Sequence, residues 1–160
     1  MDSRRPALEA LVTLLGQEEA TLAELLRLAD RMRDALIASD FALLDEAVRS
    51  MSDAGDNLDD LERDRERIVS GLADGALSID ATIALADELG VPALSDRRSR
   101  VAALALDLQQ AQERNAQLVL GAVRLRERWV NILAGMVAPT YGARGRQNVA
   151  ASRRFVSKSA

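Results

Sequence analysis

The stretch that decides the fold is 101-VAALALDLQQAQERNAQLVLGAVRLRERWVNILAGM-136. In it a series of mostly apolar residues recurs at alternating steps of three and four. This spacing places them on one face of a helix, the face that meets a partner helix. We call these positions the 101–136 seam: Val101, Leu104, Leu108, Ala111, Asn115, Leu118, Ala122, Leu125, Trp129, Ile132 and Met136. The sequence therefore predicts a helix from the Ser95-Asp96 cap to about Val137, roughly 42 residues or about 60 Å long.

Upstream of this helix, the same periodicity predicts two more long helices and one short helix. The first should span about residues 6–37, with an apolar face that only Glu18 interrupts. The second should span about residues 41–72, and the short one about residues 79–89. The short connection between the first two helices makes the second either turn back antiparallel to the first or continue it with a kink, and we favour the antiparallel hairpin.

The boundaries of these helices carry capping residues. Ser39 and Asp40 precede the second helix and Ser78 precedes the short one, and such side chains accept hydrogen bonds from the first free backbone N–H groups. Asp74-Gly75 and Gly90 stand where helices should stop. The predicted fold is all-α: an elongated antiparallel hairpin or bundle of three long helices plus one short helix, residues 1–138, followed by a flexible basic tail, residues 139–160.

The composition agrees with such a fold and narrows the classes of function. Of the 160 residues 48% are hydrophobic, but only 2% are aromatic, which indicates an aliphatic helical core. The chain contains no cysteine and no histidine, which removes thiol and imidazole catalysis and the metal sites that need these ligands. It also lacks a phosphate-binding Gly-x-x-x-x-Gly-Lys-Ser/Thr motif. We expect no enzymatic activity, no cofactor and no metal.

Hydropathy and charge address location and nucleic acid binding. No apolar run approaches the roughly 20 residues that cross a bilayer, and the first residues do not resemble a signal peptide, so we expect a cytoplasmic protein without stable membrane insertion. The net charge is −4, while the last 20 residues carry five basic side chains and no acid, which leaves −9 on the preceding 140. Because such an acidic body repels phosphate, we interpret the tail as a solvated segment and expect no nucleic acid partner.

Two seam residues have alternative interpretations. Asn115 falls at a position where a polar residue lowers stability but fixes the register of packed helices, and we favour this role over partner recognition. Trp129 is interpreted first as a core aromatic residue and second as an anchor in an exposed groove for a partner helix. Further apolar residues widen this face beyond a two-helix stripe: Leu106, Leu120, Val123 and Val130.

Three short motifs, taken in order, resemble the FlgN family of flagellar export chaperones. Residues 139–145, Pro-Thr-Tyr-Gly-Ala-Arg-Gly, are similar to the segment after that family's last helix. Residues 113–118 resemble the asparagine-containing stretch of that helix, and residues 61–65 resemble the Leu-Glu-x-x-Arg end of its second helix.

The resemblance implies an all-helical, cytoplasmic, non-enzymatic chaperone that holds the C-terminal helices of hook-associated proteins and delivers them to the flagellar export gate. The implied cargo surface lies in the second half of the last helix: Leu118, Ala122, Leu125, Trp129, Ile132 and Met136. The implied gate-docking residues are Tyr141, Gly142 and Gly145. From the sequence alone, Tyr141 fits equally well as a residue that contacts a partner and as a loop residue without a function.

A different function fits the same helical pattern. A coiled-coil scaffold or adaptor, as a homodimer without secretion cargo, would also need the 101–136 seam. It predicts that Trp129 and Ile132 are buried by self-association, whereas a chaperone buries them only when cargo binds. Light scattering combined with tryptophan fluorescence separates the two hypotheses.

Overall fold

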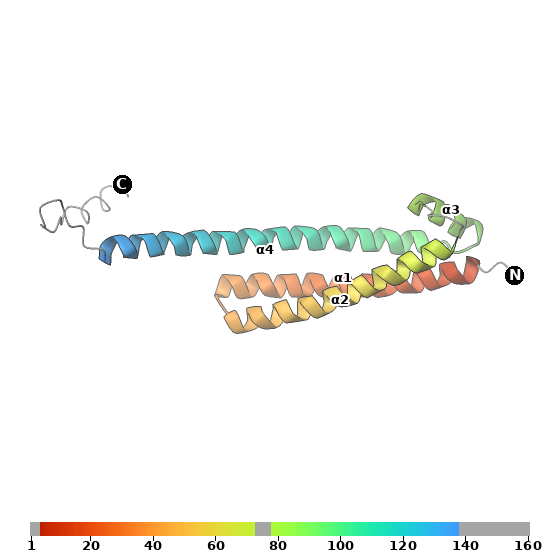
Figure 1. Cartoon of the computed structure of the whole chain (residues 1–160). Coiled ribbons are helices and arrows are strands. Elements are labelled where there is room, and N and C mark those ends of the chain that lie inside the picture. Colours follow the sequence, from red (N-terminus) through yellow and green to blue (C-terminus); the bar gives the residue numbers. More distant parts are fainter. Residues whose placement is uncertain (1–3, 73–77, 138–160) are drawn as a thin grey trace, which may run out of the picture. The chain divides into compact units, whose positions relative to one another are not determined.

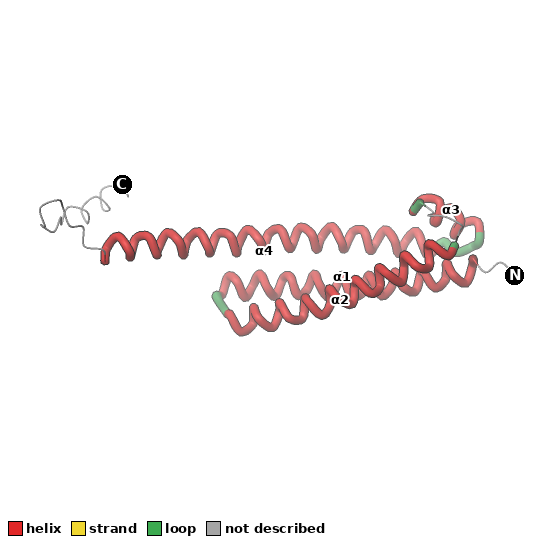
Figure 2. The backbone as a smooth tube through the Cα atoms, in the orientation of Figure 1, coloured by secondary structure: helices red, strands yellow, loops and turns green. Residues whose placement is uncertain are grey.

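The computed structural model describes residues 4–72 and 78–137, which form four α-helices and no strand (Figures 1 and 2). Their bounds are α1 Arg4–Ala38, α2 Phe41–Gly71, α3 Ile79–Glu88 and α4 Ala93–Val137. The predicted all-α class, with three long helices and one short helix, is confirmed. The predicted Asp74-Gly75 helix stop and the predicted tail, residues 139–160, lie outside the described residues.

The chain divides into two units, residues 1–116 and residues 117–160, and α4 contributes to both. In the first unit α1 and α2 form the predicted antiparallel hairpin (Figure 1). The first part of α4 packs against α1 and runs parallel to it, since Leu94 joins the cluster of Leu8 while Leu108 joins that of Leu22.

The helix ends follow the local sequence closely. The Asp40 carboxylate accepts from the backbone N–H of Leu43 at 3.0 Å, and the Ser78 hydroxyl accepts from that of Ala81 at 3.2 Å, so both predicted caps are confirmed. Gly90 follows α3 with a φ of +72°, the left-handed conformation that glycine adopts without strain. The prediction that α4 starts at the Ser95-Asp96 cap was wrong, because the helix already begins at Ala93.

The earlier start of α4 has a local cause. The carbonyl oxygen of Val91 accepts from the N–H of Leu94 at 3.3 Å, and this turn starts the helix directly after Pro92. The fixed φ of proline suits the position at a helix entrance. The apolar residues just before Ser95 thereby join the body of the protein, and Leu94 is buried.

Two apolar clusters hold the first unit together. The first cluster joins α1, the end of α2, α3 and the start of α4, and its buried members are Leu8, Leu11, Leu15, Leu72, Ala86, Val91 and Leu94. The second cluster lies further along α1, and its buried members are Leu22, Leu25, Ala29, Leu108 and Ala111. The first part of the 101–136 seam thus contributes to the core, as its periodicity predicts.

α1 carries a second buried stripe that the sequence pattern did not predict. Leu14, Leu28 and Ala35 are buried although they lie beside the predicted face. These three residues are spaced by seven or fourteen positions along α1, and Thr21 occupies the place between Leu14 and Leu28 in the same series. The Thr21 hydroxyl accepts a 3.0 Å hydrogen bond from the side-chain amide of Asn57 on α2. α1 is therefore covered on two sides, by α2 and by α4, which needs a wider buried face than one seam supplies.

A carboxylate is buried where the predicted face of α1 is interrupted. Glu18 is only 1% exposed, and its Oε2 lies 2.9 Å from Nη1 of Arg65 on α2. Desolvation by burial raises the pKa of the Glu18 carboxyl above its ordinary value of 4.5, while the charge of Arg65 lowers the pKa and that of Glu62 raises it. The charged form of Glu18 therefore costs free energy that Arg65 offsets only in part.

The buried asparagine of the seam serves the fold. Asn115 is buried, and its Nδ2 donates a 2.8 Å hydrogen bond to the carbonyl oxygen of Ala29 on α1. A polar group in this position is satisfied only when α1 and α4 are in the correct register. The geometry supports the structural interpretation of Asn115.

Candidate protein-binding surface

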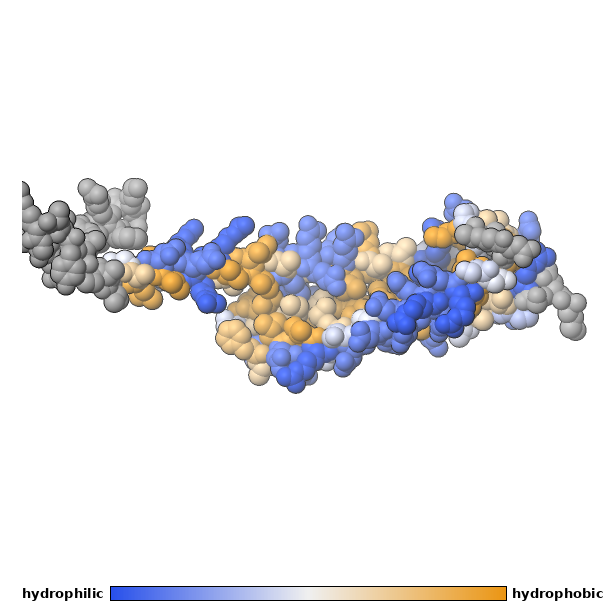
Figure 3. All heavy atoms as spheres, in the orientation of Figure 1, coloured by the Kyte–Doolittle hydropathy of each residue, from blue (hydrophilic) through white to orange (hydrophobic). Residues whose placement is uncertain are grey.

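The C-terminal half of α4, residues 117–137, carries an apolar face that the described chain leaves uncovered. We call the predicted cargo positions on it the 118–136 face: Leu118, Ala122, Leu125, Trp129, Ile132 and Met136. Leu118, Leu125 and Met136 are large hydrophobic residues exposed by 39%, 56% and 75%, and Ala122 is exposed too. Only Ile132 is half-buried. Figure 3 shows hydrophobic side chains among hydrophilic ones along this part of α4.

The first interpretation of Trp129 was wrong. A core aromatic residue was expected, but Trp129 is 57% exposed. The three–four spacing runs unchanged from Val101 to Met136, yet in this chain the buried seam residues end at Asn115. Periodicity shows that a face is suited to packing, whereas burial depends on whether another helix is present. Trp129 is therefore exposed in the single chain, and its use as an anchor for a partner helix stays a prediction.

A second apolar stripe lies beside the 118–136 face. Val119, Val123, Val130 and Leu133 are all exposed, and each follows a face residue by one position. Because neighbours along a helix differ by about 100° in direction, the two stripes together form a broad apolar surface. Arg126 lies within the second stripe. Such a surface is suited to the apolar faces of partner helices, which dock residues at these spacings.

Charge also distinguishes this part of α4. Residues 117–137 contain Arg124, Arg126 and Arg128 against Glu127, a net charge of +2. None of the four forms an ion pair among the described residues, so their charges are available to a partner. A basic surface favours association with an acidic or amphipathic segment and speeds the encounter.

The remaining predicted site residues are not placed. Tyr141, Gly142 and Gly145, the implied gate-docking residues, lie outside the described residues. Within residues 4–72 and 78–137 no group of three or more acidic side chains is arranged to hold a metal ion. Over the same ranges, no helix combines the length and apolarity required to cross a membrane.

These features define an all-α protein with an exposed apolar helix face. A protein-family model described as "FlgN protein" matches residues 1–148 of the chain. The chain therefore belongs to the FlgN family. The family is one of flagellar export chaperones, and the resemblance drawn from the three sequence motifs is confirmed. No curated protein and no solved structure matches the chain.

Proposed function

We propose that this chaperone binds the C-terminal helices of hook-associated proteins on the 118–136 face and delivers them to the flagellar export gate. One observation supports the cargo surface above all others: Leu118, Leu125, Trp129 and Met136 are exposed on one face of a single helix. Large apolar side chains gathered in this way mark an interaction surface.

The physical logic follows from the hydrophobic effect. Burial of apolar surface contributes roughly 25 cal/mol per Å², so a broad helical face binds an amphipathic helix without any covalent chemistry. A terminal cargo helix that lacks its own partner exposes a similar face and aggregates. When the two faces cover each other, the cargo stays soluble, and the complex dissociates when the gate offers a competing surface.

Substitution of Trp129 tests the cargo surface. We expect Trp129→Ala to weaken binding of synthetic C-terminal helices of the hook-associated proteins by about 30-fold or more, because buried tryptophans are often worth about 2 kcal/mol. Isothermal titration calorimetry measures this change. Phe41→Ala is the matched control, since Phe41 is an even more exposed aromatic residue on α2. Equal affinities for the Trp129→Ala and wild-type chains would refute the cargo surface.

The proposed gate contact needs a separate readout. The resemblance assigns docking to Tyr141, Gly142 and Gly145, so Tyr141→Ala should leave the cargo affinity unchanged while secretion of hook-associated proteins falls. A chain ending at Val137 should behave in the same way and keep its helical circular dichroism. Normal secretion by either variant would remove Tyr141 from the proposal and leave the cargo surface intact.

Self-association is the competing explanation of the exposed face. A homodimeric scaffold would bury Trp129 in the free protein and show twice the monomer mass by light scattering. The chaperone proposal expects a solvent-exposed tryptophan whose emission shifts to shorter wavelength only when a cargo helix is added. A stable dimer with buried Trp129 and no response to cargo would overturn the proposal.

A further inference from the structure

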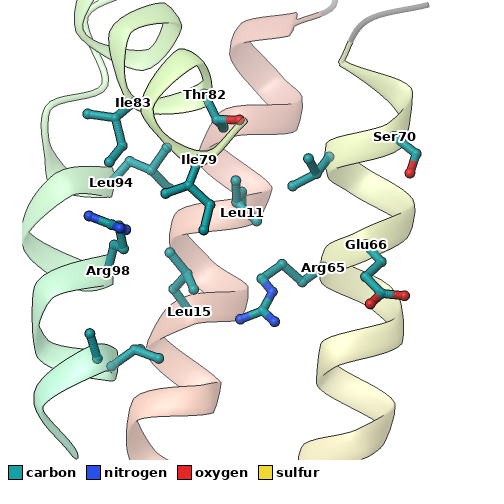
Figure 4. Close-up of a pocket in the computed structure, with 13 residues that line it drawn as sticks. Leu11, Leu15, Arg65, Glu66, Ser70, Ile79, Thr82, Ile83, Leu94 and Arg98 are labelled. Atoms are coloured by element: carbon teal, nitrogen blue, oxygen red, sulfur yellow. The ribbon is translucent and has the colours of Figure 1, made fainter. Parts of the chain in front are cut away.

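A groove in the first unit remains outside the proposed cargo surface. It runs between α2 and α4 with α1 as its floor, and α3 closes one end (Figure 4). It consists of two hollows of about 550 and 310 Å³, which share Arg65 and Val101 as lining residues. All of its lining residues belong to the unit of residues 1–116.

The larger hollow is mainly apolar. Its lining includes Leu11 and Leu15 of α1, Val69 of α2 and Leu94 of α4. Ile79 of α3 reaches toward it at the closed end (Figure 4). Ile79 is 60% exposed. An apolar slot beside three packed helices is where a fourth helix of a bundle would lie.

The smaller hollow contains an unsatisfied polar atom. Glu18 lines it and is 1% exposed, and its Oε1 has no hydrogen-bond partner among the described residues. The other oxygen, Oε2, is already bonded to Arg65. Buried polar atoms almost always have a partner, and a missing one costs free energy. The groove therefore presents an acceptor that a ligand can satisfy.

The charges around this acceptor favour a cationic donor. Glu62 lines the same hollow as Glu18, and Arg65 is the only basic residue of its lining. The opposite wall on α4 supplies the neutral side chains of Gln109 and Gln112. Two carboxylates against one guanidinium leave a local excess of one negative charge, which a lysine or arginine of a ligand would neutralise.

We propose that this groove binds an amphipathic helix of a partner protein, whose apolar stripe fills the slot and whose lysine or arginine donates to Oε1 of Glu18. The floor extends from Leu11 to Leu22, which corresponds to about three helical turns. The site is separate from the 118–136 face, and it does not depend on the cargo assignment.

The probe is a display library of 14-residue helical peptides. Each peptide has an apolar stripe, and one position of that stripe is fully randomised. Selection on the full-length chain should enrich lysine or arginine at that position. The same selection on Glu18→Gln should lose the enrichment, and selected peptides should bind this variant about tenfold or more weakly, since hydrogen bonds to charged groups are the stronger ones.

A pair of alanines on α4 supplies a test that leaves Glu18 untouched. Ala105 lines the smaller hollow and is exposed, so Ala105→Phe should obstruct the groove and abolish peptide binding. Ala103→Phe is the matched control, because Ala103 is exposed on the same helix but does not line the groove. The proposal is overturned if no peptide is selected or if Ala105→Phe leaves binding unchanged. It is also overturned if the selected peptides carry no lysine or arginine at the randomised position, which is the result expected when water alone satisfies Glu18.

Discussion

Removal of the Arg65 side chain should destabilise the protein by isolating a buried charge. In the folded chain Oε2 of Glu18 lies 2.9 Å from Nη1 of Arg65, and Glu18 is 1% exposed. Breaking a fully buried pair by removing one partner costs about 3–5 kcal/mol. The side chain of Arg65 is 34% exposed, so water reaches the pair and screens part of this cost. We therefore expect Arg65→Met to lower the free energy of unfolding by about 2–3 kcal/mol.

A double-mutant cycle with Glu18→Gln isolates the charge effect from packing. Urea unfolding followed by circular dichroism gives the free energy of unfolding for the four chains. In the Glu18→Gln background no carboxylate remains at position 18 for Arg65 to compensate, and Arg65→Met should cost less than about 1 kcal/mol. If Arg65→Met costs the same in both backgrounds, the pair does not compensate a buried charge, and the reasoning fails.

The same pair predicts how stability changes with pH. Because burial raises the pKa of Glu18, the folded chain holds this proton more tightly than the unfolded chain. The contribution of Glu18 to the free energy of unfolding should therefore fall as pH rises from the ordinary pKa of 4.5 through the raised value. Relative to wild type, Glu18→Gln should gain stability across that window. A difference independent of pH would contradict the assignment.

Four further substitutions are expected to change stability, each measured by the midpoint of thermal or denaturant unfolding. Asn115→Ala should cost about 0.5–1.5 kcal/mol, because the hydrogen bond from Asn115 to the carbonyl of Ala29 is lost while that carbonyl keeps its donor within α1. Leu8→Ala should cost about 2–5 kcal/mol by opening a cavity at a fully buried position. Ser39→Gly should stabilise by about 0.5–1 kcal/mol, since Ser39 has a φ of +56°. Gly55→Ala should stabilise by a similar amount, because a Cβ there meets nothing within 4 Å and α2 is continuous through it.

Local signals in the sequence were sufficient for the helices. The caps at Asp40 and Ser78 and the stop at Gly90 are satisfied by atoms within four residues, so their geometry follows from the sequence nearby. The late start predicted for α4 shows the limit of such rules. Ser95 and Asp96 are good capping residues, but the turn from Val91 to Leu94 lies earlier in the chain and already starts the helix, and Leu94 is buried.

The candidate surface was only half predictable. The spacing identified the 118–136 face as one suited to packing, and the family resemblance suggested its use. The spacing could not show that Trp129 is exposed, because an identical pattern upstream is buried at Leu108 and Ala111. The second stripe on α1 was missed for a related reason, since it becomes core only where two helices cover α1.

The sequence by itself determined the helices, their caps, the all-α class and the family, because each depends on interactions between near neighbours or on short motifs. The tertiary structure decided which parts of the periodic apolar pattern are buried and which polar side chains are paired. It joins Glu18 to Arg65 across 47 residues and Asn115 to Ala29 across 86, and it forms the groove between α2 and α4. It also leaves the 118–136 face exposed. Burial and pairing depend on which surfaces meet in space, and a periodic pattern shows only that a face is able to meet one.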